Sequence, residues 1–203
     1  MTTAGQKRNH KIGKVILGMA MSLDGFVNDR NGSVDRLYPD LEALTKTKIM
    51  VDSIRDTGAV VMGRHAFAMS EDPDLYAASY EFQVPIIVLT HNRPEKQPKE
   101  NDRLKFIFVS DGIESAIEKA YAVAGDKNVA VIGGASTAQQ CLSAGLVDEL
   151  HVDLMTVLLG GGLRFFENID SERIRLEKIE VLESVKGGTY IRFRVEYVGR
   201  SDV

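Results

Sequence analysis

The hydrophobic positions in the first two thirds of the chain form short continuous runs, each bounded by turn-forming residues. Runs of this kind are typical of strands that are buried on both faces, as in a parallel sheet. We therefore predict five such strands, at residues 14–21, 59–62, 86–89, 106–109 and 129–132.

Between these strands the apolar residues follow helical spacing. We predict three helices, at residues 41–55, 113–124 and 135–143, and each is followed by a glycine suited to end it: Gly58, Gly125 and Gly145. An alternation of strands and helices indicates right-handed crossovers and a largely parallel sheet.

The final third of the chain has a different pattern. At residues 150–154 and 191–197 apolar side chains alternate with polar ones, as in strands with one face in water. The apolar positions of residues 174–182 change phase near Lys178, which predicts a bulged strand, and Gly187-Gly188 predicts a hairpin turn. We therefore expect one α/β domain over residues 14–203, after a flexible tail over residues 1–13. Its mostly parallel sheet has helices on both faces and an antiparallel C-terminal hairpin.

Charge and cysteine content exclude several classes of function. The 203 residues include 25 Lys and Arg against 29 Asp and Glu, and a net charge of −4 gives a nucleic-acid backbone no general attraction. The single cysteine, Cys141, excludes a disulfide framework, and no His/Cys cluster has the spacing of a metal site. No apolar run reaches the length of roughly 18 residues that a membrane span needs. We expect a cytoplasmic protein without a metal, a membrane or a nucleic acid as partner.

Two glycine-containing turns at the ends of predicted strands are compatible with phosphate binding. Gly63-Arg64 follows the second strand, and Gly133-Gly134 follows the fifth, with Ser136 and Thr137 in the next helical turn. Backbone N–H groups at a helix N-terminus favour anions, and open α/β sheets place ligands at the carboxyl ends of their strands. Neither turn has the dinucleotide or P-loop pattern, so a typical Rossmann domain and a nucleotide triphosphatase are disfavoured. Ordinary turn formation remains the alternative for both.

The order of these motifs resembles the dihydrofolate reductase-like superfamily. Within it, the chain is most similar to the reductase domain of the bifunctional riboflavin-biosynthesis deaminase-reductase. The resemblance extends from residue 14 to about residue 198 and rests on four segments. These are Ser-Leu-Asp-Gly at 22–25, Val-Met-Gly-Arg-His at 61–65, Val-Ile-Gly-Gly-Ala at 131–135, and Gly-Leu-Val-Asp-Glu-Leu at 145–150 leading into Val-Leu-Leu-Gly-Gly-Gly at 157–162.

In that superfamily NADPH lies across the carboxyl ends of the central strands, so the resemblance implies a cofactor role for three turns. The first would hold the phosphates, the second would border the adenosine end, and the third would cradle the pyrophosphate and the nicotinamide side. The implied residues are Gly63, Arg64 and His65; Thr90, Asn92 and Arg93; and Gly133, Gly134, Ala135, Ser136 and Thr137.

The chain departs from the riboflavin branch at positions that would bind the substrate. Gly18 stands where that branch usually has a lysine, Ile132 where it has an acidic residue, and no arginine follows Asp72-Pro73 closely. A phosphoribosyl group needs cationic partners, which these changes remove. The resemblance therefore implies a related reductase with a different substrate.

Asp24 and Asp40 are the candidate catalytic acids. Asp24, in the loop after the first strand, would face the nicotinamide region and orient or protonate a substrate nitrogen. Asp40 stands at the predicted helix start, where the resemblance to dihydrofolate reductase places an active-site acid. Each also has a structural alternative, since Asp-Gly commonly forms a turn and Asp commonly caps a helix.

We therefore expect an NADPH-dependent reductase that transfers hydride to a small heterocyclic molecule, assembled as a homodimer like proteins of this kind. Two alternatives stay open. One is an NADP(H)- or small-ligand-binding protein that has the reductase fold without efficient turnover, and the other is a weak dihydrofolate reductase.

Overall fold

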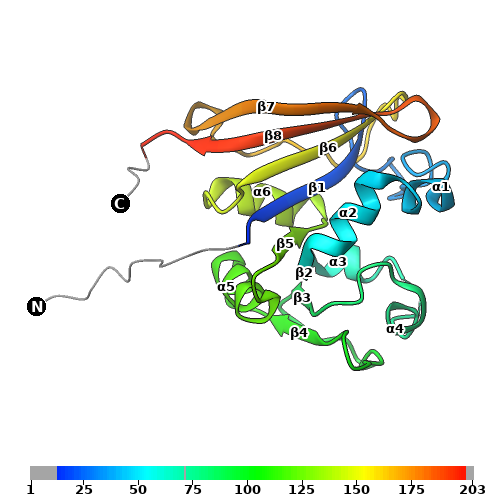
Figure 1. Cartoon of the computed structure of the whole chain (residues 1–203), viewed down its shortest axis with the longest axis vertical. Helices are drawn as coiled ribbons and strands as arrows, with labels where there is room; N and C mark the ends of the chain where they lie inside the picture. The colour runs from blue at the N-terminus through cyan, green and yellow to red at the C-terminus, as the bar shows by residue number, and fades with distance from the viewer. Residues whose placement is uncertain (1–12, 71, 200–203) are drawn as a thin grey trace, which may run out of the picture.

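The computed structural model describes residues 13–70 and 72–199. They contain one eight-stranded sheet with the order β4-β3-β2-β5-β1-β6-β8-β7, which runs from the lower to the upper part of Figure 1. The strands are β1 (Val15–Ser22), β2 (Thr57–Gly63), β3 (Ile86–Leu89), β4 (Phe106–Val109), β5 (Asn128–Val131), β6 (Glu149–Met155), β7 (Ile174–Glu183) and β8 (Thr189–Tyr197).

The sheet is parallel from β4 to β6 and antiparallel from β6 to β7. All five buried strands predicted from continuous apolar runs are present, β3 and β4 with the same bounds as predicted. The predicted bulge is confirmed, because the pairing of β7 with β8 shifts register between Lys178 and Glu180. The fold class is therefore confirmed.

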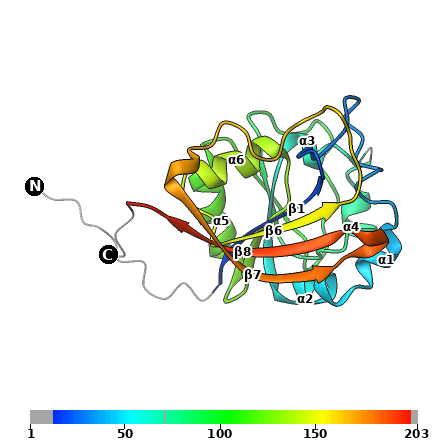
Figure 2. The same ribbon diagram turned by 90° about the horizontal axis from the view of Figure 1, so that it is seen from above.

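Alternate residues of the central strands pack into two hydrophobic cores, one on each face of the sheet. On one face Val61 and Ile87 pack with helices α5 (Ile113–Ala124) and α6 (Ala135–Ser143), whose bounds also match the prediction. On the other face Val60 and Val88 pack with Phe67. Figure 2 shows α5 and α6 on one side of the sheet and the N-terminal helices on the other. Runs without alternation thus reflect burial on both faces.

The predicted helix at residues 41–55 is wrong as a single element. Two helices are present, α1 (Leu41–Thr45) and α2 (Lys48–Asp56), because the Thr47 side chain accepts a hydrogen bond from the backbone N–H of Met50 and starts a new helix. Gly58 does not end α2 but lies within β2. A Cβ at Gly58 would be 2.2 Å from the carbonyl oxygen of Ala124, so close packing against α5 requires glycine there.

Four short helices complete the fold. They are α3 (Arg64–Phe67), α4 (Leu75–Ser79), and the 3₁₀ turns η1 (Ser171–Arg173) and η2 (Val185–Gly187). The turn η2 contains Gly187 of the predicted hairpin between β7 and β8. The predicted tail at residues 1–13 lies outside the described residues, except for Gly13, which is buried beside the carbonyl of Lys127. In the part of the chain that is described, no helix is long and apolar enough to cross a membrane.

Candidate functional site

Two cavities adjoin at the carboxyl ends of β2 and β5. The smaller has a volume of about 470 Å³ and the larger of about 940 Å³. Met62 and Ile132 line the larger cavity, whereas Gly63, the next residue after Met62, and Gly134, two residues after Ile132, line the smaller one. The two spaces therefore share a wall at the edge where open α/β sheets bind ligands.

The smaller cavity brings together most of the residues that the resemblance assigns to the cofactor. Arg64 and His65 come from the turn after β2, and His91 lies beside them on the loop after β3. The lining includes no carboxylate. Nine of the eleven implied residues line it: Gly63, Arg64, His65, Thr90, Asn92, Gly134, Ala135, Ser136 and Thr137.

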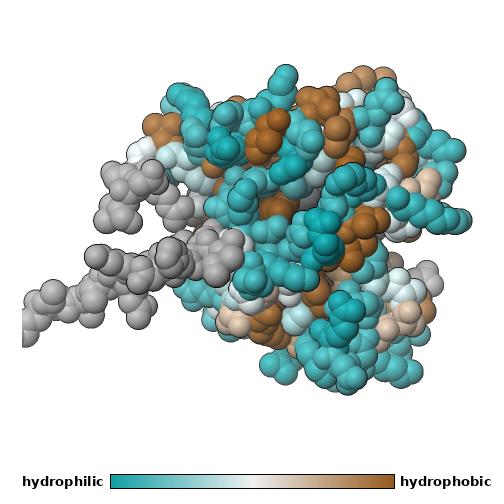
Figure 3. Space-filling view, in the orientation of Figure 1, coloured by the Kyte–Doolittle hydropathy of each residue, from teal (hydrophilic) through white to brown (hydrophobic). Residues whose placement is uncertain are grey.

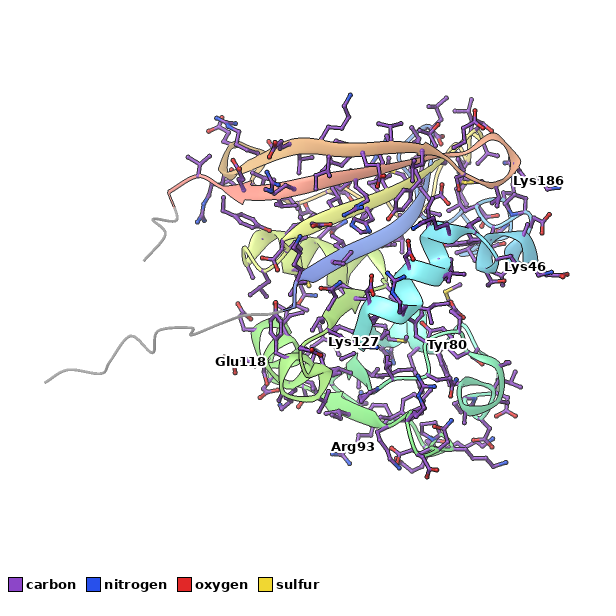
Figure 4. All side chains as sticks on the ribbon, viewed as in Figure 1. Lys46, Tyr80, Arg93, Glu118, Lys127 and Lys186 are labelled. Carbon is purple, nitrogen blue, oxygen red and sulfur yellow. The ribbon has the colours of Figure 1, made fainter. Side chains whose placement is uncertain are left out.

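The two remaining residues lie apart from this lining. The carbonyl of Gly133 accepts a hydrogen bond from the N–H of Gly63, at 2.8 Å, and this bond joins the two glycine turns. Arg93 is exposed on the loop after β3, and Figure 4 shows it at the margin of the molecule. Arg64 is thus the arginine that contributes to the cavity wall.

The floor of the smaller cavity depends on close packing between β2 and α6. A Cβ at Gly63 would be 2.4 Å from Oγ1 of Thr137, a residue that is itself buried. The N-cap of α6 is Gly134, which has no side chain to accept hydrogen bonds from the first turn. The N–H groups of that turn therefore remain able to donate to a ligand.

Asp24 connects two loops. Its carboxylate accepts hydrogen bonds from the Ser22 hydroxyl at 2.6 Å and from the N–H groups of Leu159 at 3.0 Å and Gly160 at 2.7 Å. These bonds, the one from Ser22 foremost, lower the pKa of Asp24 to about 2. Asp24 does not line either cavity. In this arrangement it is ionised and fastens the loop after β1 to the segment after β6.

The glycines after Gly160 allow this contact. Gly162 has a φ of +129°, and a Cβ there would be 1.9 Å from the carbonyl oxygen of Asn28. The triglycine thus lets the backbone of the two loops approach closely, as glycine in such a position does.

Asp40 is the N-cap of α1. Its carboxylate accepts a hydrogen bond from the Ala43 N–H at 2.9 Å and pairs with Lys186 at 3.3 Å. The hydrogen bond from Ala43 and the ion pair lower its pKa. Asp40 does not line either cavity, so the structure gives it the capping position that its place at a helix start also predicts. A catalytic role for Asp24 or Asp40 stays a prediction.

The larger cavity is mostly apolar. Its polar strip consists of His151 and Asp153 on β6 and Tyr190 on β8. Methionine and aromatic side chains from β1, β2, α2 and α4 form much of its wall, including Met19, Met50, Met62 and Tyr76. Tyr80 also lines it, and Figure 4 shows this residue between α2 and α4. A mostly apolar cavity with a few polar groups is typical of small-molecule sites.

Besides the exposed Asp35, two carboxyl groups that were not predicted from the sequence line this larger cavity. Burial raises the pKa of both Asp153, on β6, and Glu81, on the loop after α4. The Ser184 hydroxyl donates to Asp153 Oδ2 at 2.9 Å, while Oδ1 is buried without a hydrogen-bond partner. These carboxyl groups therefore hold a proton to a higher pH than an exposed carboxyl group does.

A hydrogen-bonded chain runs along the polar strip. His151 Nε2 lies 3.0 Å from Glu149, and His151 Nδ1 lies 2.7 Å from the Tyr190 hydroxyl. Lys14 and Arg192 also pair with Glu149, at 2.5 and 3.1 Å. The hydrogen bond from His151, followed by those from the two cations, holds the pKa of Glu149 far below its usual range.

The alternating pattern of β6 predicts a different environment for these polar residues. Glu149, His151 and Asp153 alternate with apolar residues, which predicts a strand face in water. Instead this face of β6 forms the cavity wall, since His151 lies beside Gly18 of β1. A Cβ at Gly18 would have 3.9 Å to the Cβ of His151, its nearest neighbour, so the missing side chain leaves this wall open. Within the described ranges, 13–70 and 72–199, no group of three or more His, Cys, Asp or Glu residues is arranged to hold a metal ion.

Among curated proteins, the chain is similar to the "Uncharacterized protein YyaP" of Bacillus subtilis (strain 168). The two are 28% identical over 184 residues, which cover 84% of this chain and 89% of that protein.

Solved structures share the fold. A "Putative riboflavin biosynthesis protein" from Shewanella sp. PV-4 has a TM-score of 0.71 at 22% identity, covering 90% of this chain and 99% of that one. Dihydrofolate reductase from Enterococcus faecalis, complexed with NADP(H), has a TM-score of 0.56 at 17% identity, covering 90% of this chain and 96% of that one. The resemblance to the dihydrofolate reductase-like superfamily is therefore confirmed at the level of the fold.

The sequence also matches the RibD C-terminal domain over residues 13–187, which span both glycine turns, β6 and the polar strip as far as Ser184. Because this match covers most of the chain, the protein belongs to the RibD C-terminal domain family.

Proposed function

We propose that the protein is an NADPH-dependent reductase of a small ring-containing molecule, with the cofactor in the smaller cavity and the substrate in the larger. The observation that carries this proposal is the shared wall, where Met62 is followed by Gly63 and Ile132 is close to Gly134. A dinucleotide held in the smaller cavity could reach the larger one across this wall. A substrate and a hydride donor must meet in such a geometry.

The residues of the smaller cavity suit an anionic dinucleotide. Arg64 can bind a phosphate with two parallel hydrogen bonds, and the first turn of α6 offers free N–H groups. A protein with a net charge of −4 would repel phosphates elsewhere, but no carboxylate lines this cavity. NADPH, when bound, would supply hydride to a C=N or C=O bond.

The larger cavity would hold and orient the substrate. Its apolar wall would favour an apolar ring, and its half-buried carboxyl groups, Asp153 and Glu81, would supply the proton that accompanies hydride. This assignment differs from the expectation for Asp24 and Asp40, whose carboxylates are occupied by loop and cap hydrogen bonds.

Titration of the protein with NADPH, followed by nicotinamide fluorescence, tests the cofactor half. We expect saturation at micromolar NADPH. The Arg64→Ala variant should weaken NADPH binding by at least about tenfold and NADH binding less, because a charge-assisted bond to the extra phosphate is lost. Arg175→Ala, on the edge strand β7, is the matched control. No binding at near-millimolar NADPH would remove the proposal, and equal weakening for both cofactors would remove the phosphate-reading role of Arg64.

The carboxylates of Asp24 and Asp40 already accept hydrogen bonds from backbone N–H groups. This observation favours one alternative, an NADP(H)-binding protein that turns over no substrate efficiently. Such a protein would bind NADPH and oxidise none of it with pterin or pyrimidine substrates. A weak dihydrofolate reductase would instead oxidise NADPH slowly with dihydrofolate, and Asp40→Asn would abolish this activity if Asp40 were its acid.

We also propose that the protein forms a homodimer, in the cytoplasm, through the outer face of the C-terminal strands. Four apolar side chains of the edge strand β7 are exposed, among them Val181 at 50%. Figure 3 shows hydrophobic residues at the surface in this region. An exposed apolar edge strand is usually covered or paired. Sedimentation velocity should give a dimer mass that Val181→Lys converts to a monomer, and a monomeric wild type would remove this proposal.

A further inference from the structure

Most of the ionisable side chains that line the larger cavity are acidic. Its lining includes the carboxyl groups of Asp35, Glu81 and Asp153 and the imidazole of His151, and it includes no lysine or arginine. The ionisable side chains that line the smaller cavity are basic: they are Arg64, His65 and His91, and no carboxylate is among them. The two cavities therefore differ in the ligand charge that each can accept.

The cations behind the polar strip are already paired. Arg192, opposite His151 in the antiparallel pairing, donates to Glu149 at 3.1 Å and to Glu180 at 2.9 Å. Lys14 is bound to the other oxygen of Glu149. Because Glu149 and Glu180 neutralise these groups, neither cation offers an unpaired charge to the cavity.

The chain of hydrogen bonds also fixes what Tyr190 can offer. Glu149 is ionised and can only accept, so a neutral His151 donates from Nε2 and accepts at Nδ1. With this form of His151, the Tyr190 hydroxyl donates a hydrogen bond to His151 Nδ1. The Tyr190 oxygen can then only accept a hydrogen bond, so it favours a ligand that carries a hydrogen-bond donor.

From these contacts we infer that the larger cavity selects neutral or cationic apolar molecules that carry N–H donors, such as aromatic amines and amidines, and rejects carboxylates and phosphate esters. The inference rests on the proposed function in treating this cavity as the substrate site. It names the substrate class by charge and hydrogen-bonding polarity. A phosphorylated substrate would meet Asp153 and Glu81 in an apolar surrounding without a compensating cation.

Three naphthalene probes with the same apolar body test this inference by calorimetric titration of the full chain at pH 7.5. Naphthalene-2-carboxamidine is cationic, naphthalene-2-carboxamide is neutral with N–H donors, and naphthalene-2-carboxylate is anionic. We expect the amidine to bind at least about tenfold more tightly than the carboxylate, with the amide between them. Equal or tighter binding of the carboxylate overturns the inference, as does the absence of binding by all three at millimolar concentration.

Variants locate the selectivity. Asp153→Asn together with Glu81→Gln should bring the amidine-to-carboxylate affinity ratio within about threefold of one, and Tyr190→Phe should weaken the amide severalfold. Asp126→Asn, exposed in the turn after α5, removes a carboxyl group outside both cavities and should leave the ratio unchanged. An unaltered ratio in the folded double variant contradicts the assignment, and the comparison of probes on wild type does not depend on any variant's folding.

The probe titration requires no NADPH, so the two proposals can fail separately. If NADPH does not bind and the amidine is still preferred, the reductase proposal fails and the charge selectivity stands. If NADPH binds and the carboxylate is preferred, the reductase proposal stands and the inference about substrate class fails.

Discussion

The two adjoining cavities share a wall of two glycine turns but differ in almost every chemical respect. The smaller is lined by backbone N–H groups, hydroxyls and an arginine from the parallel part of the sheet. The larger is mostly apolar, with carboxyl groups and tyrosines contributed in part by β6 and β8, which pair antiparallel. The difference teaches that a protein with a net charge of −4 can still have a cavity whose lining holds an arginine and no carboxylate, because the carboxyl groups line a separate cavity.

The largest expected effect comes from placing a cation in the larger cavity. Gly18→Lys should fit, since a Cβ there has 3.9 Å to its nearest neighbour, and its ammonium would meet the cavity's carboxyl groups. We expect the amidine-to-carboxylate affinity ratio of the naphthalene probes to fall about a hundredfold, which corresponds to roughly 2.7 kcal/mol. Gly18→Gln is the uncharged control. A ratio that stays as in wild type would show that charge does not distinguish the cavities.

A packing change tests the wall of the smaller cavity. Gly63→Ala would place a methyl group 2.4 Å from Oγ1 of the buried Thr137, so we expect a loss of about 2 kcal/mol in unfolding free energy. Adding Thr137→Ala removes the oxygen and should restore more than half of that loss. Urea unfolding of both variants measures this coupling, and purely additive effects would contradict the close contact.

Glu149 is predicted to keep the cations behind the larger cavity neutralised. Glu149→Gln should cost about 1.5 kcal/mol of unfolding free energy at pH 7, with Arg192 partly in solvent. Because the folded-state pKa of Glu149 is depressed, its contribution is present above the unfolded value, about 4.3, and is lost as pH falls through the folded pKa. The difference between wild type and variant should therefore shrink between pH 7 and pH 3. A gap of constant size over this range would disprove the linkage.

The smallest expected effect is a gain in the free energy of unfolding. Burial raises the folded-state pKa of Asp153, so its charged form costs stability above that pKa, and the cost disappears below the unfolded value of about 3.9. Asp153→Asn should raise stability at pH 7 by about 1 kcal/mol, read as a higher Tm, and the gain should vanish near pH 3. A lower Tm at pH 7 would mean that the carboxylate is better solvated than its position in the larger cavity implies.

Much of the fold could be predicted because strands that are buried on both faces appear in the sequence as continuous apolar runs. The runs at residues 86–89 and 106–109 became β3 and β4 with unchanged bounds. The helix at residues 41–55 could not be predicted correctly, because apolar spacing continues across Thr47 while its hydroxyl starts a second helix.

The candidate site could also be predicted only in part. The positions of the glycine turns at Gly63 and Gly134 were predictable, because each turn follows a buried strand and precedes a helix. Asp153 and Glu81 were not, because one lies on an alternating strand and the other on a loop. Their common property, facing one apolar cavity, arises from strand register and packing.

The placement of Tyr190 and Asp153 on β8 and β6 has a consequence for how the family can diversify. The N–H groups and Arg64 that would hold a dinucleotide belong to the turns after β2 and β5, while much of the polar strip belongs to strands near the opposite edge of the sheet. The residues of one half of the sheet can therefore stay unchanged during evolution while those of the other half are substituted. A laboratory library confined to the positions of β6 and β8 that line the larger cavity could change its ligand without altering the residues that line the smaller cavity.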